Sequence, residues 1–235
     1  MEPGTRARAV VFDAYGTLLD IHAAMAKHAA RLGPNWPEIS ADWRRKQLEY
    51  SWIRALTGPS QHLDFWRLTR DALHWTAARH GIGDEAMLSD VLMAYRHLDP
   101  YPEVPAMLAR IRDHDLRTAI LSNGEPAMLA DAIRSANLDD LLDFVLSVEA
   151  VGVFKPDPRV YRLAEERLQL PASQMAFVSS NAWDAFGAHV FGFQVFWINR
   201  TRQPAEYGLS DVATELTDLA ELPAALGLTS PRVAR

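Results

Sequence analysis

Five short apolar runs alternate with helical patterns along most of the chain, and this alternation restricts the possible folds more than any other feature. The runs cover residues 9–13, 118–122, 144–148, 175–180 and 195–199. Each has the length and composition typical of a buried strand. Helices are expected to begin at Pro126, at Pro158 and after Asn181, which would cap the third. This alternation predicts an α/β fold with a Rossmann-like, doubly wound parallel sheet.

Residues 21–99 interrupt the alternation, because this stretch contains no strand-like run. Helical patterns cover residues 42–56 and 65–80, with turn-forming Gly and Pro residues around them. We therefore expect an all-helical cap domain, residues 21–99, inserted after the first strand into a core domain made of residues 1–20 and 100–235. A cap over the carboxyl edge of the sheet shapes a pocket and excludes water. Residues 229–235 are predicted to form a loose tail.

Composition excludes several kinds of partner and site. The 235-residue chain has a net charge of −6, which does not suit binding to nucleic acid or to an anionic membrane surface. No apolar stretch approaches the length that spans a bilayer. The sequence has no cysteine, so disulfides and thiolate metal sites are impossible, and its eight histidines show no metal-ligand spacing. A cytoplasmic location is expected.

Polar residues follow four of the predicted strands. They are Asp13, the pair Ser122-Asn123, Lys155, and the group Ser179-Ser180-Asn181 with Asp184. Because the carboxyl ends of parallel strands share one edge of a sheet, these side chains are expected to converge. An ionised carboxylate beside an amine, with one face free, is a competent nucleophile toward carbon or phosphorus. Taken singly, Asp13 could instead serve a turn, and Asp184 could complement a helix dipole.

The strand-end residues occur in segments that resemble a known family. Asp13-x-Tyr15-Gly16-Thr17-Leu18, Ser122-Asn123-Gly124, Lys155-Pro156 and Asn181-x-x-Asp184 resemble, in this order, the four motifs of the haloacid dehalogenase superfamily. Residues 43–50, 121–124, 154–161, 177–184 and 197–200 are similar, more narrowly, to the L-2-haloacid dehalogenases. The resemblance extends over nearly the whole chain. It implies hydrolysis of short-chain (S)-2-haloalkanoic acids to (R)-2-hydroxyalkanoic acids and halide.

Mg-dependent phosphatases of the same superfamily are the enzymatic alternative. Phosphatases of that family carry a second Asp, a general acid, two residues after the nucleophile. That position is Tyr15 here, and the ordinary pKa of tyrosine is about 10. They also carry an acidic cluster that holds Mg²⁺, and the corresponding residues are Ser179, Ser180 and Asn181. We therefore expect neither a metal nor another cofactor. A binding protein without turnover is the remaining alternative, which the intact charged residues disfavour.

The resemblance implies a covalent mechanism in two steps. Asp13 attacks C2 of the substrate, and Arg44 accepts the departing halide with help from Asn123. Three further residues then position the water that hydrolyses the Asp13 ester. These residues are Asp184, Asn181 and Lys155.

The resemblance also implies how the substrate is held. Its carboxylate is expected on Ser122 and on the backbone N–H groups of Ala14 and Tyr15. The apolar part of the pocket is expected to be lined by Tyr15, Leu48, Phe65 and Trp183. Leucine and aromatic residues at helical spacing are more often core, so these are the weaker assignments.

Three residues are expected to orient the reacting groups. Thr17 and Ser179 would orient Asp13 and its neighbours, and Tyr161 would hydrogen-bond Lys155 or the reaction centre. Thr17 and Ser179 could equally stabilise local turns through their hydroxyl groups, a role compatible with the first.

Two features of residues 42–56 leave alternatives open. The position after Arg44, often Gln in the family, is Arg45. It could face the pocket or the solvent, since adjacent residues of a helix point about 100° apart. The segment also carries more apolar surface than one core face needs. Similar family members pair through the cap, so a homodimer is expected.

Overall fold

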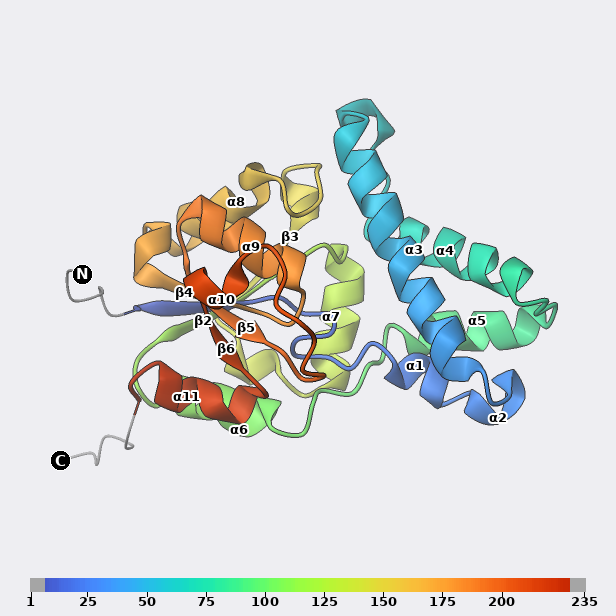
Figure 1. Cartoon of the computed structure of the whole chain (residues 1–235), viewed down its shortest axis with the longest axis horizontal. Coiled ribbons are helices and arrows are strands. Elements are labelled where there is room, and N and C mark those ends of the chain that lie inside the picture. The colour runs from blue at the N-terminus through green and yellow to red at the C-terminus, as the bar shows by residue number, and fades with distance from the viewer. Residues whose placement is uncertain (1–6, 229–235) are drawn as a thin grey trace.

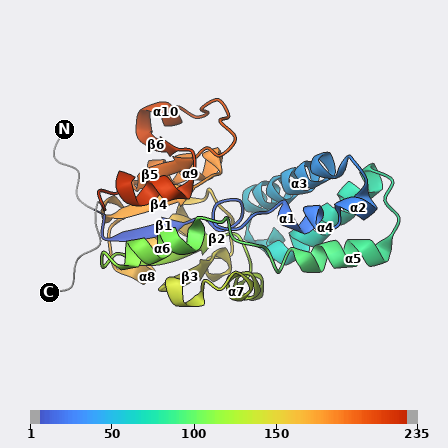
Figure 2. The ribbon, with the colours of Figure 1, turned by 90° about the horizontal axis from the view of Figure 1, so that it is seen from below.

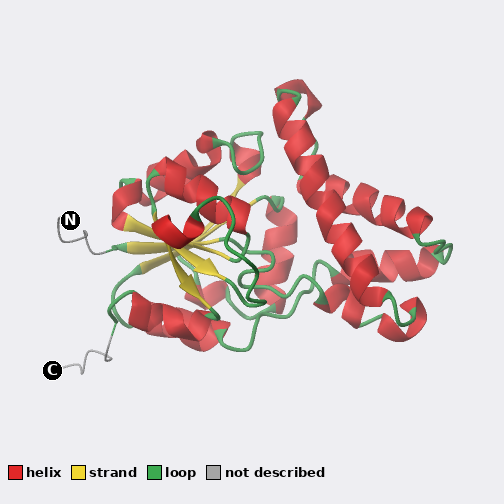
Figure 3. Cartoon of the chain, in the orientation of Figure 1, coloured by secondary structure: helices red, strands yellow, loops and turns green. Residues whose placement is uncertain are grey.

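A six-stranded parallel sheet forms the centre of the computed structural model, which describes residues 7–228 (Figures 1 and 3). The strands are β1 (Ala9–Phe12), β2 (Arg117–Ser122), β3 (Phe144–Ser147), β4 (Met175–Ser179), β5 (Gln194–Ile198) and β6 (Ala213–Leu216). Their spatial order is β3-β2-β1-β4-β5-β6. This arrangement confirms the predicted fold class. The predicted tail, residues 229–235, lies outside the described residues.

The central strand β1 ends level with its two neighbours. Phe12 pairs with Ile120 of β2 and with Val178 of β4. All residues of β1 are fully buried, as a parallel strand covered on both faces should be. The chain therefore leaves these three strands at the same edge of the sheet, and the residues that follow lie close together.

Strand β6 was not predicted from the sequence. Its residues Ala-Thr-Glu-Leu include two exposed polar side chains and form no apolar run. β6 lies at the edge of the sheet and pairs only with β5, so it needs less apolar surface than the inner strands.

Helices cover both faces of the sheet. Those of the core are α6 (Val104–Arg112), α7 (Pro126–Ser135), α8 (Pro158–Leu168), α9 (Ala182–Phe191), α10 (Leu209–Val212) and α11 (Leu222–Ala225). α6 and α11 pack together on one face, and α8 and α9 lie on the other (Figure 1). α7 and α8 begin at the predicted prolines, after the N-cap carboxylates of Glu125 and Asp157.

The segment between β1 and α6 folds as an all-helical cap. Its helices are α1 (Ala23–Ala26), α2 (Ala29–Leu32), α3 (Trp36–Leu56), α4 (Phe65–Arg79) and α5 (Glu85–Ala94). α3 begins at Trp36 rather than at residue 42, because Pro37 falls in its first turn, where a proline costs no hydrogen bond. α5 was not predicted. α3 and α4 pack along each other, and Trp43 Nε1 donates to the Thr69 carbonyl at 2.8 Å.

Two chain segments join the cap to the core and run side by side (Figure 2). Leu19 forms a bridge with Pro100, and the Tyr101 N–H donates to the Leu18 carbonyl at 3.0 Å. The entry to the cap and the exit from it therefore adjoin. Within residues 7–228, no helix is both long enough and apolar enough to cross a membrane.

Gly187 on α9 allows a close contact that a larger residue would prevent. A Cβ at this position would lie 2.5 Å from Tyr161 Oη and 2.8 Å from Pro156 Cβ. Overpacking of this kind costs about 1–3 kcal/mol, so Gly187→Ala is expected to lower the free energy of unfolding by that amount in chemical denaturation. Gly83→Ala is the matched control, because a Cβ there meets nothing within 4 Å. If Gly187→Ala and Gly83→Ala have the same free energy of unfolding, α8 and α9 can move apart without an energetic cost, and the prediction is wrong.

Candidate active site

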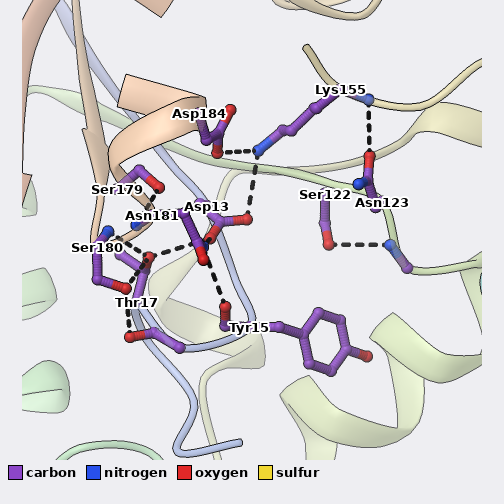
Figure 4. Close-up of polar contacts among 12 residues, drawn as sticks. Asp13, Tyr15, Thr17, Ser122, Asn123, Lys155, Ser179, Ser180, Asn181 and Asp184 are labelled. Carbon is purple, nitrogen blue, oxygen red and sulfur yellow. Dashed lines mark hydrogen bonds and ion pairs between the residues drawn. The ribbon is translucent and has the colours of Figure 1, made fainter. Parts of the chain in front are cut away.

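Asp13, the residue after β1, is held by donors from three segments of the core (Figure 4). Its Oδ2 accepts hydrogen bonds from Thr17 Oγ1 at 3.1 Å and from Asn181 Nδ2 at 2.8 Å. Its Oδ1 accepts one from Lys155 Nζ at 3.3 Å. These donors fix the direction of a carboxylate that is only 6% exposed. A carboxylate oriented in this way can act as a nucleophile without rearranging.

Lys155 places its ammonium group between two carboxylates. Its Nζ lies 3.3 Å from Asp13 Oδ1 and 2.7 Å from Asp184 Oδ2, and its side chain is almost completely buried. Burial alone would lower the pKa of Lys155, but the charges of Asp13 and Asp184 and their hydrogen bonds outweigh it and raise the pKa. The lysine therefore keeps its proton at neutral pH and supplies a fixed positive charge.

Asp184 lies on the first turn of α9 and is fully buried. Burial raises the pKa of its carboxyl group to about 6, with the charge of Asp13 acting in the same direction. Lys155 and the hydrogen bond from Tyr161 Oη, 2.8 Å long, partly oppose this. A carboxyl group with a pKa near the working pH suits proton abstraction from water.

Tyr161 contacts Asp184 and not Lys155. Its hydroxyl donates to Asp184 Oδ1, and its pKa is raised well above the ordinary value by burial and by the Asp184 charge. Of the two contacts expected for Tyr161, the described structure has the one with the reaction centre, through Asp184, and not the one with Lys155. The Tyr161 hydroxyl also donates to the Asp184 backbone carbonyl at 3.3 Å, so both of its hydrogen bonds go to Asp184.

The loop after β4 forms hydrogen bonds with the loop after β1, which carries the nucleophile. Ser180 Oγ donates to the Gly16 carbonyl at 2.6 Å, and the Ser180 N–H donates to Thr17 Oγ1 at 2.9 Å. Ser180 therefore orients the hydroxyl that bonds Asp13. The sequence placed Ser180 with the converging strand-end residues but assigned it no role in the site, although its place between two predicted site residues was a signal.

Ser179 and Asn181 form a second part of this support. Ser179 Oγ accepts from the Asn181 N–H at 3.1 Å, and among the described residues Ser179 forms no hydrogen bond with Asp13 itself. Asn181 occupies the N-cap position of α9, but its side chain does not cap the helix. The expected cap is wrong because the amide is turned toward Asp13 Oδ2.

One small cavity brings together most of the residues expected to bind substrate. It has a volume of about 10 Å³ and is lined by Asp13, Tyr15, Arg44, Leu48, Phe65, Ser122, Asn123 and Trp183. Ala14 is fully buried and is not part of this lining. This is far below the roughly 300–1,000 Å³ typical of sites for drug-sized ligands, so only a small ligand can be accommodated, and only with slight movement of the lining side chains.

Arg44 brings a guanidinium group from α3 of the cap into this cavity. One nitrogen donates to the Tyr15 carbonyl at 3.3 Å, and Nε is buried without a hydrogen-bond partner. No carboxylate lies within ion-pair distance of Arg44 in residues 7–228. A partly buried cation without a counter-charge can bind an anion. Arg45, by contrast, is exposed and pairs with Asp42 at 2.9 Å, so it faces away from the cavity.

Ser122 and Asn123 form the wall contributed by β2. Ser122 Oγ accepts from the Gly124 N–H at 3.0 Å, which leaves its own proton to donate. Asn123 Oδ1 accepts from the Lys155 N–H at 3.0 Å. This bond fixes the amide with its Nδ2 directed away from the Lys155 N–H. Both residues can therefore offer hydrogen-bond donors to an anionic ligand.

The site differs from that of a Mg-dependent phosphatase, which has a general acid near the nucleophile and an acidic cluster for the metal ion. Tyr15 is buried, and burial raises its pKa well above the ordinary value, so it is a poor acid. Its ring stacks on Tyr95 with 5.5 Å between the ring centroids. In the part of the chain that the structure describes, no group of three or more His, Asp or Glu side chains is placed to hold a metal ion.

Together, the parallel sheet, the helical cap and the strand-end aspartate define the class of capped α/β hydrolases with a carboxylate nucleophile. Residues 7–192 match the family model of the haloacid dehalogenase-like hydrolases. The chain is 45% identical to (S)-2-haloacid dehalogenase 1 of Pseudomonas sp. (strain CBS-3) over 217 residues, which are 92% of this chain and 95% of that protein. It is 46% identical to the (S)-2-haloacid dehalogenase of Xanthobacter autotrophicus over 200 residues, covering 84% of this chain and 77% of that one.

A solved structure from the same family of relatives also matches this chain. The L-2-haloacid dehalogenase from Xanthobacter autotrophicus with chloropropionic acid covalently bound matches with a TM-score of 0.85 and 37% identity, covering 95% of this chain and 100% of that chain. The chain belongs to the (S)-2-haloacid dehalogenase family of the haloacid dehalogenase-like hydrolases. The resemblance noted in the sequence motifs is thereby confirmed.

The contact between Tyr161 and Asp184 can be tested without a substrate. In ¹³C NMR of protein labelled at aspartate side chains, we expect the Asp184 carboxyl carbon to titrate near pH 6. Its resonance is assigned by its loss in Asp184→Asn. Tyr161→Phe removes a hydrogen bond that favours the anion, so the pKa should rise further, by about one unit. Tyr95→Phe is the control, since its hydroxyl bonds Gln47 in the cap. An unmoved pKa in Tyr161→Phe would contradict the contact.

Proposed function

We propose that this protein hydrolyses short-chain (S)-2-haloalkanoic acids to (R)-2-hydroxyalkanoic acids and halide. The observation that carries the proposal is the cavity in which the Asp13 carboxylate and the Arg44 guanidinium share one small, closed space. A carbon–halogen bond needs a nucleophile on one side and an acceptor of negative charge on the other. The relatives that bear this activity in their names support the assignment.

In the first step, Asp13 Oδ1 attacks C2 of the substrate in line with the halogen. A C–O bond forms while the carbon–halogen bond breaks, and the halide leaves with the bonding electron pair. Arg44 and Asn123 receive the halide, since both present donors to the cavity. C2 is inverted, which accounts for an (R) product from an (S) substrate. Ser122 and the backbone N–H groups of Ala14 and Tyr15 hold the substrate carboxylate.

In the second step, water attacks the carbonyl carbon of the Asp13 ester. Asp184 takes the proton from this water, and Lys155, 2.7 Å away, orients the base. Asp13 Oδ2 becomes the oxyanion, and the donors Thr17 and Asn181 already point at it. The bond between the carbonyl carbon and Asp13 Oδ1, which stays on the substrate, then breaks. Asp184 returns its proton to this leaving oxygen, which frees the hydroxy acid, and the Asp13 carboxyl group loses the second proton of the water to solvent, which restores the carboxylate. Neither step requires a metal or an organic cofactor.

The apolar walls restrict the substrate at C2. Tyr15, Leu48, Phe65 and Trp183 surround the space beside Asp13, and Phe65 is almost fully buried. The small enclosed volume favours a short alkyl group and keeps bulk water from the ester. Ser179 and Tyr161 act by positioning Asn181 and Asp184 rather than by touching the substrate.

Halide release in the presence of EDTA tests the proposal. We expect the protein to release chloride from (S)-2-chloropropionate, much less from the (R) enantiomer, with no loss of rate in EDTA. Asp13→Ala, which cannot revert to aspartate by deamidation, should lower the rate at least about a thousandfold. No chloride release, together with Mg-dependent phosphate release from a phosphomonoester, would identify a phosphatase. Neither activity would identify a binding protein.

The same reaction in H₂¹⁸O distinguishes attack by Asp13 from direct attack by water. With enzyme in excess over substrate, the 2-hydroxy acid should contain no ¹⁸O, and the label should appear in Asp13 on peptide mass analysis. Label in the product of this single turnover would rule out the ester mechanism.

We also infer two domains and a homodimer in the cytoplasm. The domains are residues 1–20 with 100–235, and residues 21–99, since the two linkers adjoin at Leu19 and Pro100. The outer face of α3 leaves Ile53 55% exposed, which favours a partner on the cap. Light scattering should give the mass of two chains, and Ile53→Asp should give that of one. An unchanged mass in Ile53→Asp would place the contact elsewhere.

A further inference from the structure

One face of α3 carries a row of side chains that extends beyond the Asp13 cavity. Arg44, Leu48, Trp52 and Leu56 recur at intervals of four residues, so each lies next to the one before it, about 40° further around the helix. Arg44 and Leu48 line the Asp13 cavity. Trp52 and Leu56, the next two members, line a different space.

This second space is an apolar cleft between the cap and the core. α3 lines one side, and α9 with the loop after β3 lines the other. Its apolar lining includes Trp52, Leu56, Phe154, Trp183, Phe186 and Tyr207. A charged residue on its wall, Asp157, is already paired with Arg159 at 2.7 Å. Leu56 is 83% exposed and Tyr207 53%, so the cleft opens to solvent on this side.

Trp183 belongs to both spaces, and Trp52 packs against it. The two indole rings meet edge to face, with centroids 5.5 Å apart and an interplanar angle of 83°. Trp183 lines the closed Asp13 cavity and also the open cleft, so the ring pair forms the partition between them. Trp52 holds that partition from the cleft side, where Trp183 has no other aromatic partner among the described residues.

We propose that Trp52 determines the upper limit of substrate chain length by closing the Asp13 cavity against this cleft. The inference rests on the proposed function. With the partition in place, the alkyl group at C2 of a 2-haloalkanoate ends at Trp183. With Trp52 removed, Trp183 can swing aside, and the alkyl chain extends from the cavity into the cleft along Phe154 and Phe186.

The indole nitrogen of Trp52 gives this role a second support. Trp52 Nε1 is buried and has no hydrogen-bond partner within residues 7–228. Buried tryptophans usually find a partner for this group, and leaving it unpaired opposes folding. A phenylalanine or leucine would pack on α3 without that cost. The size of the indole, which reaches Trp183, is the property that distinguishes tryptophan here.

The test compares two substrates on four forms of the full-length protein. The substrates are (S)-2-bromopropionate and (S)-2-bromohexanoate, and the measured quantity is the ratio of their kcat/KM values for bromide release. Each methylene that moves from water into an apolar site improves binding up to about fourfold. For the three extra methylenes, Trp52→Ala is therefore expected to raise the hexanoate-to-propionate ratio by about tenfold to sixtyfold, mainly through a lower KM for the longer acid.

Two variants serve as controls. Trp52→Phe keeps an aromatic ring against Trp183 and loses only the N–H group, so its ratio should stay within about twofold of wild type. Trp75→Ala removes the same volume from the cap at a site that contacts Lys46 and Arg45 on the outer surface, and should leave the ratio unchanged. Thermal unfolding is recorded for each form. If Trp52→Ala does not fold, Trp52→Leu provides a smaller opening with a smaller expected rise.

The outcomes separate the two hypotheses. A folded Trp52→Ala or Trp52→Leu that hydrolyses bromopropionate with an unchanged ratio overturns the role of Trp52 and leaves the proposed function intact. A wild type that already prefers bromohexanoate also overturns it. A wild type that releases no bromide from either acid overturns the proposed function, and the chain-length inference with it. An increased hexanoate-to-propionate ratio in Trp52→Ala, with the ratios of Trp52→Phe and Trp75→Ala close to wild type, supports both the proposed function and the role of Trp52.

Discussion

The ammonium group of Lys155, buried between Asp13 and Asp184, is the interaction on which the rest of the site depends. Two buried carboxylates so close together would repel each other, and one would take up a proton. The single cation reduces the repulsion but does not cancel both charges, so the trio keeps a net negative charge that can attack an electrophilic carbon. Lys155 is part of the loop after β3, so the fold sets the position of its charge. A bound metal ion could serve a similar purpose, but here the chain supplies the cation.

The sheet gathers these groups because its inner strands end level with one another. Phe12 is in register with Ile120 and Val178, and the polar residues of the site follow within a few positions of each strand end. Burying so many polar groups is favourable only when they satisfy one another. Asp13 has three donors, and Asp184 accepts hydrogen bonds from a lysine and a tyrosine. The site is therefore a connected network, in which one side chain cannot move without leaving another unpaired.

Much of this arrangement follows from the sequence, and the exceptions have physical causes. Buried parallel strands appear as continuous apolar runs, so the four inner strands were predictable. Of the two edge strands, β3 still has an apolar run, whereas β6 is too polar to be recognised. Residues at strand ends could be placed together before their contacts were known. The partners of individual side chains could not, since they depend on loop geometry. Asn181 turns to Asp13 instead of capping α9, and Ser180 supports Thr17, because the loop after β4 lies beside the loop after β1.

Chemistry and size selection come from different parts of the molecule. The core supplies the nucleophile and the groups that hydrolyse the ester from strand ends, where the backbone is fixed on both sides, and the cap adds only the cation of Arg44. The cap supplies a single helix face, and α3 advances about 6 Å with every four residues. Arg44 and Leu48 therefore line the Asp13 cavity at successive positions, and Trp52, one turn further along, lines the adjoining cleft. A change at one of these positions alters which molecules reach Asp13 without altering the network around Lys155. Such a division lets one catalytic core accept different substrates as the residues of one cap helix vary.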